Sequence, residues 1–132
     1  MKRCVMAGPG RSVLEEVPIP NIAADEVLVK MKYCGVCRSE HDAWREAAPG
    51  RLLGHEPVGT VARLGEQVTG FAVGDRVSGL SHPALAEYVV FKAEHTVKIP
   101  DEISDEDAMA EPLACLVSAI DKLPLRGFMR PS

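Results

Sequence analysis

The alternation of apolar and polar residues over 26–33 places the strongest constraint on the fold. Val27, Val29 and Met31 fall on one face with Tyr33, and Leu28 falls on the other face with two lysines. A period of two is typical of a half-buried β-strand. Similar short strands are expected at 3–6, 13–17, 58–64, 76–78, 87–91 and 96–98, with glycines at turns between them. Many short strands of this kind predict a mainly β fold, either a barrel or a sandwich.

The character of the sequence changes after Pro100. Ser104 followed by Asp107 resembles a helix-capping signal, and Pro112 suits the first position of a helix. We therefore expect a short helical turn before Glu111 and a second helix over 112–122. An apolar stripe runs along that second helix: Leu113, Leu116, Val117 and Ile120. Residues 124–132 have no periodicity and are expected to form an unstructured tail.

Length and charge exclude several classes of function. A chain of 132 residues has the length of a single domain. Its net charge of −4, with scattered Lys and Arg, gives no basis for binding nucleic acid or an anionic membrane. No stretch approaches the ~20 apolar residues that span a bilayer, and the N-terminus lacks the apolar region of a signal peptide. The four cysteines have uneven spacings that fit a disulfide framework poorly. We therefore predict a cytoplasmic protein with reduced thiols.

Three short segments carry the residue types of a metal site. They are Cys-Gly-Val-Cys-Arg-Ser-Glu over 34–40, Gly-His-Glu over 54–56 and Glu-Pro-Leu over 111–113. Thiolate, imidazole and carboxylate are the ligands that zinc prefers. Each segment alone is a weak signal, since Cys-x-x-Cys also occurs as a redox pair or as half of a structural zinc site.

Taken in order, these segments resemble the medium-chain dehydrogenase/reductase superfamily. The resemblance also rests on Gly-His-Glu-Pro-Val-Gly-Thr-Val, Val-Gly-Asp-Arg-Val, Ala-Glu-Tyr-Val and Val-Lys-Ile-Pro, and it spans nearly the whole chain. The Glu-Pro-Leu variant is similar to the sorbitol and threonine dehydrogenase branch. The resemblance implies a GroES-like β-barrel over residues 1–123, with one catalytic zinc.

The same resemblance assigns roles to individual residues. It implies that Cys37 and His55 are zinc ligands, that Glu56 is a ligand or an adjacent catalytic carboxylate, and that Glu111 is a ligand or a partner of the water on the metal. Ser39 matches the hydroxyl that passes the proton of the substrate alcohol toward solvent. The implied reaction is the oxidation of a secondary alcohol or polyol, with NAD(P) bound only in a full-length relative.

Three departures from the family pattern qualify these expectations. Glu40 stands where the family usually has the aspartate that orients the zinc-bound histidine, which puts that geometry in doubt. The four-cysteine lobe of many relatives is missing between Gly79 and Ala86, so no structural zinc is expected. The glycine-rich turn of the Rossmann domain is also missing, so we expect this chain to be inactive alone.

Other interpretations of the chain remain open. One is a stand-alone zinc-binding or protein-interaction barrel that self-associates through the apolar face around Leu113, Val117 and Ile120. Another makes Cys34 and Cys37 a thiol–disulfide pair, although packing is favoured for Cys34. For Cys4 and Cys115 a place in the core is favoured.

Overall fold

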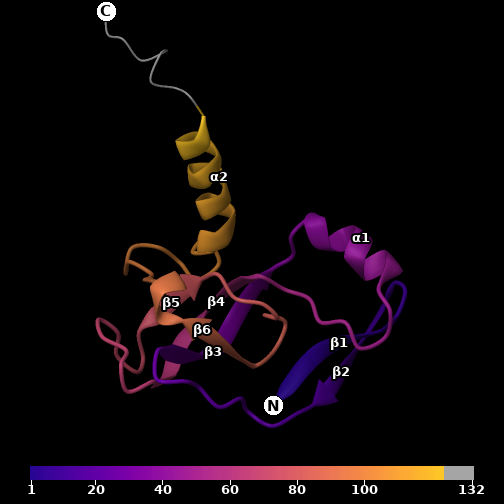
Figure 1. Cartoon of the computed structure of the whole chain (residues 1–132), viewed down its shortest axis with the longest axis horizontal. Helices are drawn as coiled ribbons and strands as arrows, with labels where there is room; N and C mark the ends of the chain where they lie inside the picture. Colours follow the sequence, from indigo (N-terminus) through magenta and orange to yellow (C-terminus); the bar gives the residue numbers. More distant parts are fainter. Residues whose placement is uncertain (124–132) are drawn as a thin grey trace, which may run out of the picture.

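The computed structural model describes residues 1–123, which form seven β-strands and two α-helices (Figure 1). The elements in chain order are β1 (Lys2–Gly8), β2 (Arg11–Glu16), β3 (Glu26–Gly35), α1 (Ser39–Glu46), β4 (Glu56–Leu64), β5 (Arg76–Gly79), β6 (Tyr88–Lys92), a 3-10 turn η1 (Ala93–His95), β7 (Thr96–Lys98) and α2 (Ala110–Lys122). All seven predicted strands are confirmed, with bounds that differ by at most two residues. The unstructured tail predicted for 124–132 lies outside the described residues.

The strands form two antiparallel sheets. A five-stranded sheet has the order β6-β3-β4-β5-β7, and β1 and β2 form a separate hairpin. Backbone hydrogen bonds join the hairpin to the segment before β6: the Cys4 amide donates to the Leu85 carbonyl at 2.8 Å, and the Glu87 amide donates to the Lys2 carbonyl at 3.0 Å. The result is the curled half-barrel expected of a GroES-like domain.

The core lies on the inner face of the five-stranded sheet, and its buried members are Val27, Val29, Val61, Val77, Ala84, Val89 and Phe91. Val27 and Val29 thus lie in the core as the alternation predicted, although Leu28, which the alternation put on the opposite face, is buried as well. The alternation breaks down toward the end of the strand, where Tyr33 is exposed. The register between β3 and β4 shifts between Met31 and Tyr33, and a bulge of this kind changes the direction in which the following side chains point.

Helix α1 was not predicted. Its sequence, Ser-Glu-His-Asp-Ala-Trp-Arg-Glu, is polar on nearly every face, and its buried residue is Glu40. The helix is tied to the β1–β2 hairpin, because the Gly10 amide donates to the Trp44 carbonyl at 2.8 Å and the Trp44 indole donates to Ser12 Oγ at 3.0 Å. A helix with so little apolar periodicity gives no signal to pattern analysis.

Helix α2 confirms the predicted C-terminal helix, with its first residue at Ala110. The helix stands out from the barrel in Figure 1, and none of residues 110–122 is buried. The short helical turn expected before it is a hydrogen-bonded turn, in which the Asp107 amide donates to Ser104 Oγ at 3.3 Å. Neither α-helix within residues 1–123 has the length and apolar character to span a bilayer.

The segment that leads into α2 is fixed to the sheet by Asp105. Its carboxylate accepts hydrogen bonds from Lys32 on β3 and from Arg76 on β5, each at 2.7 Å. These two cations lower the pKa of Asp105 below its usual range. Asp105 therefore joins the β3 and β5 strands to the approach of α2.

Candidate metal centre

Donor atoms of Cys37, His55 and Glu56 all lie within 4.8 Å of one another. The topology explains why they meet. β3 and β4 pair antiparallel, with Gly35 opposite Glu56, so the end of one strand lies beside the start of the next. Cys37 follows β3 by two residues, His55 immediately precedes β4, and Glu56 begins it. The structure thus brings together three of the predicted site residues from two distant segments.

Two glycines leave room for these side chains. A β-carbon on Gly35 would lie 1.9 Å from Glu56 Oε2 and 2.8 Å from Met109 Sδ, so only glycine leaves the carboxylate where it stands. Gly54 has φ of +96°, a conformation that favours glycine, and a β-carbon there would lie 2.7 Å from the Leu85 amide nitrogen. The backbone can therefore turn sharply just before His55.

Glu40 reaches His55 in spite of being longer than the aspartate of the family pattern. Glu40 Oε1 lies 3.2 Å from His55 Nδ1 and accepts the Gly54 amide at 2.6 Å. Glu40 belongs to the first turn of α1 and is the buried residue of that helix. A hydrogen bond at Nδ1 leaves Nε2 as the nitrogen free to bind a metal. The doubt that the sequence raised about this geometry is thus answered by the contact itself.

Ser39 lies on the exposed side of the same group. Its hydroxyl donates to Cys37 Sγ at 3.1 Å, and this bond, with the Ser39 backbone and the neighbouring His55, lowers the pKa of the Cys37 thiol. Burial opposes the protonation of His55, but the Cys37 and Glu40 groups outweigh it and raise the pKa of the imidazole. These contacts therefore ease the loss of the Cys37 proton relative to a free cysteine, and the thiolate is the form that binds metals.

Glu111 is not among the donors that converge within 4.8 Å. It lies in the first turn of α2, where its carboxylate accepts the Cys115 thiol at 3.0 Å. Its role as a ligand or as a partner of water stays a prediction. The core position favoured for Cys115 is wrong, because the residue is exposed on α2.

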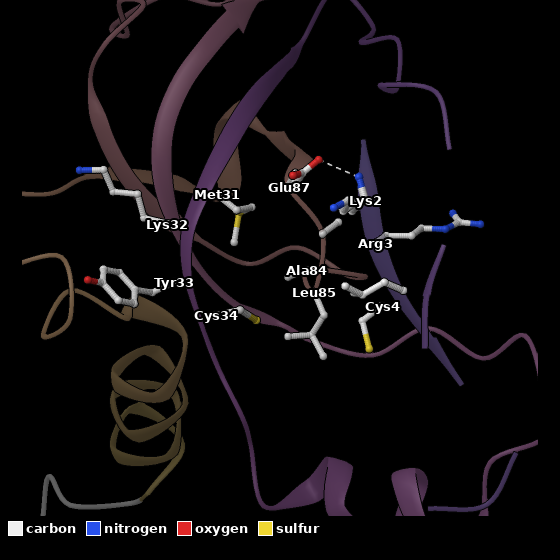
Figure 2. A pocket seen from close by; sticks show the side chains of 12 residues that line it. Lys2, Arg3, Cys4, Met31, Lys32, Tyr33, Cys34, Ala84, Leu85 and Glu87 are labelled. Atoms are coloured by element: carbon white, nitrogen blue, oxygen red, sulfur yellow. Dashed lines mark hydrogen bonds between the residues drawn. The ribbon is translucent and has the colours of Figure 1, made fainter. Parts of the chain in front are cut away.

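Cys34 packs against the core, as expected, and burial raises the pKa of its thiol. With Cys4 it lines an open pocket of about 440 Å³ between β1 and β3, which Figure 2 shows with Leu85 between the two thiols. Cys4 is half-buried at this pocket. Cys34 and Cys37 are both free thiols, so they form no disulfide in this structure.

Sequence reasoning missed two residues beside the site. Met109 places its sulfur next to Gly35 and Glu56, and Ser78 on β5 places a buried hydroxyl between β4 and α2. Neither residue type is a preferred zinc ligand and neither lies in a site motif. Only the three-dimensional arrangement shows that they adjoin the converging donors.

Comparison with known proteins agrees with the fold. The family model described as alcohol dehydrogenase GroES-like domain matches residues 23–101. L-threonine 3-dehydrogenase of Xanthomonas campestris pv. campestris is 34% identical, over 70% of this chain and 38% of that protein. Galactitol-1-phosphate dehydrogenase from Escherichia coli has a TM-score of 0.79 at 25% identity, over 92% of this chain and 44% of that one.

A putative zinc-binding dehydrogenase from Sinorhizobium meliloti 1021, solved bound to NADP, has a TM-score of 0.74 at 25% identity. That match covers 94% of this chain and 46% of the other. The chain thus spans less than half the length of these three relatives. Because the family model covers more than half of this chain, the protein belongs to the alcohol dehydrogenase GroES-like domain family, within the medium-chain dehydrogenase/reductase superfamily.

Proposed function

We propose that this chain is the catalytic-domain portion of a zinc-dependent, NAD(P)-linked dehydrogenase acting on a secondary alcohol or polyol. The convergence of Cys37, His55 and Glu56, with His55 oriented by Glu40, is the observation that carries the proposal. One thiolate, one imidazole and one carboxylate fit zinc, and a carboxylate behind the imidazole is typical of zinc-binding histidines. The names of the relatives, two of them dehydrogenases of hydroxylated substrates, support the reaction class.

In this proposal Cys37 and His55 hold the metal, with Glu56 as a third ligand or as the adjacent catalytic carboxylate. Glu111, on the first turn of α2, is the fourth candidate. When bound, zinc supplies Lewis acidity that lowers the pKa of an alcohol substrate. Ser39 is proposed to receive the substrate proton and pass it to solvent, and the exposure of its hydroxyl beside Cys37 supports that role.

The nicotinamide is proposed to bind outside residues 1–132, in the part of the relatives' length that these residues do not match. Residues 1–132 alone should then show no turnover, because the hydride has no acceptor. We further propose a cytoplasmic location, the compartment in which the four free thiols stay reduced.

The test is the zinc content of protein purified without chelators. We expect about one zinc per chain in the wild type and none in Cys37→Ala, since three-donor sites of this kind hold a single ion. Cys4→Ala is the matched control, because it removes a half-buried thiol outside the site and should leave the zinc content unchanged. A folded wild-type chain without zinc would contradict the proposal.

A non-enzymatic binding module is the second candidate, and the surface of α2 favours it. Leu113, Leu116, Val117 and Ile120 are 49–64% exposed on one helix that buries no residue. Exposed apolar groups of this extent mark surfaces that bind a partner. A folded, zinc-free chain that associates with itself through this helix would favour this candidate over the dehydrogenase.

A further inference from the structure

A buried serine connects the metal centre to α2. Ser78 on β5 is 1% exposed, in a region where the neighbouring buried side chains are mainly apolar. Its hydroxyl donates to the Pro57 carbonyl at 2.9 Å and accepts the Ala110 amide at 2.9 Å. Pro57 directly follows Glu56, and Ala110 directly precedes Glu111. One hydroxyl group thus bridges the residues adjoining two of the proposed site carboxylates.

The bond to Ala110 anchors the start of α2. The first amides of an α-helix have no partner within the helix, and the residue before α2, Met109, supplies no side-chain cap. The Ser78 hydroxyl, on strand β5, accepts the Ala110 amide in place of such a cap. Because none of residues 110–122 is buried, the rest of the helix contributes little packing that would hold it in position. Its position relative to the barrel therefore depends on its first turn and on the segment before it.

The same turn lies next to the metal-type donors. Glu56 Oε2 and Met109 Sδ both lie beside Gly35, so the side chain of the residue before α2 lies close to the Glu56 carboxylate. A shift of the helix start would therefore move Glu111 relative to Glu56. Serine is also a costly choice for packing alone, because a buried hydroxyl needs partners that an apolar side chain does not. Both partners are present here.

We propose that Ser78 is a positioning residue of the metal centre, which sets the place of Glu111 relative to Cys37, His55 and Glu56. This inference rests on the proposed function for its metal. It assigns no contact between Ser78 and the ion. The Ser78 hydroxyl acts through Ala110, whose amide it accepts. Because Glu111 is the next residue, the affinity for the metal depends on this hydrogen bond.

The first experiment measures zinc affinity of the full chain by competition with a chelator, together with the absorption spectrum of the Co²⁺-loaded protein. Ser78→Ala should bind zinc about tenfold more weakly, at the lower end of what outer hydrogen-bond partners contribute. Ala110→Pro removes the amide donor without touching the core, and proline is tolerated in the first turn of a helix. It should weaken zinc binding in the same direction. Ser81→Ala is the control, since Ser81 donates to the Val90 carbonyl at 2.7 Å, away from α2.

A double-mutant cycle of Ser78 and Glu111 distinguishes a positioning role of Ser78 from a purely structural one. Glu111→Gln should weaken zinc binding in the wild type and have little further effect in Ser78→Ala, because the misplaced carboxylate no longer contributes. Ser78→Thr keeps a hydroxyl and should restore both the affinity and the Co²⁺ spectrum. Equal losses from Glu111→Gln in the two backgrounds, or wild-type affinity in both Ser78→Ala and Ala110→Pro, would overturn the inference.

Amide hydrogen exchange in the zinc-free chain tests the anchor without any metal. The Ala110 amide should exchange faster in Ser78→Ala than in the wild type or in Ser81→Ala. Unchanged exchange at Ala110 would refute the inference whatever the zinc result. If the wild-type chain binds no zinc at all, the dehydrogenase proposal fails, and the exchange rate at Ala110 alone decides whether Ser78 holds α2.

Discussion

A carboxylate oxygen of Glu40 lies 3.2 Å from His55 Nδ1, although Glu40 belongs to helix α1 and His55 immediately precedes strand β4. The same carboxylate oxygen accepts the Gly54 amide at 2.6 Å, so it fixes both the imidazole and the backbone that carries it. Glu40 is also the buried residue of α1. This short helix therefore contributes to the candidate metal centre through the side chain that it places beside His55.

Removal of the Glu40 carboxylate should weaken zinc binding. Glu40→Ala leaves the His55 ring without its acceptor and the Gly54 amide without a partner, so we expect about 10- to 100-fold lower zinc affinity. Glu40→Gln keeps an oxygen acceptor and should lose less. Chelator competition provides the measurement, and Glu46→Ala, an exposed change on the same helix, serves as the control. Wild-type affinity in Glu40→Ala would show that His55 needs no orienting partner.

Gly35→Ala and Gly54→Ala should affect different properties, the first zinc affinity and the second the stability of the fold. Gly35→Ala places a β-carbon against side-chain atoms alone, namely those of Glu56 and Met109, so these side chains should shift and zinc affinity should fall while the barrel stays folded. Gly54→Ala meets the Leu85 backbone at a φ of +96°, and it should destabilise the fold by about 1–3 kcal/mol. Chemical denaturation and zinc titration of both variants check this. A larger loss of stability in Gly35→Ala than in Gly54→Ala would contradict the prediction.

The Asp105 ion pairs should make stability depend on pH in the acid range. Lys32 and Arg76 lower the pKa of Asp105 in the folded state, so the unfolded chain takes up the proton first as pH falls. The stabilisation is fully present above the unfolded value of about 3.9 and is lost as pH falls through the lower folded value. Asp105→Asn should therefore be less stable than the wild type at neutral pH, and the difference should shrink below about pH 4.

Urea denaturation of the zinc-free chain at several pH values measures this difference without interference from metal release. Asp101→Asn is the control, because Asp101 is an exposed carboxylate in the same segment. A stability difference between wild type and Asp105→Asn that stays constant down to the most acid pH would refute the assignment.

The apolar face of α2 should drive self-association of this chain. We expect the mass measured by sedimentation equilibrium to rise with protein concentration, because Leu113, Leu116, Val117 and Ile120 lie exposed. Leu116→Lys should suppress the rise. Leu80→Lys, at a comparably exposed position on the barrel, should not. A wild-type chain that stays monomeric at all concentrations would count against a binding role for this face.

The sequence was sufficient to predict the strands because each one carries its own pattern. The β3 alternation and the glycines between strands are local signals, and residues 2–98 contain the seven strands that they predict. The convergence of Cys37, His55 and Glu56 is not local. It depends on the pairing of Gly35 with Glu56 across β3 and β4, and ordered family motifs were the only sequence feature that indicated it.

The features that could not be predicted share a physical cause. Helix α1 has no apolar stripe, since the residue that it buries is a carboxylate satisfied by His55 and Gly54. Cys115 was placed in the core because its type is usually buried, yet it lies on a helix whose residues 110–122 are all at least partly exposed. Ser78 gives no signal in the sequence, because its role comes from two backbone groups that are distant along the chain.

Helix α2 has an exposed apolar surface along its length and residues of the candidate metal centre near its start. Its far turns extend away from the barrel in Figure 1. Met109, the residue before its first turn, has its sulfur beside Gly35 and Glu56. A partner that bound one tilt of this helix more tightly would thereby change the positions of the candidate metal ligands near its first turn. By thermodynamic reciprocity, an ion that favours the same tilt would strengthen the partner's binding by an equal factor. Metal binding at the site and partner binding at the helix surface would then be thermodynamically linked.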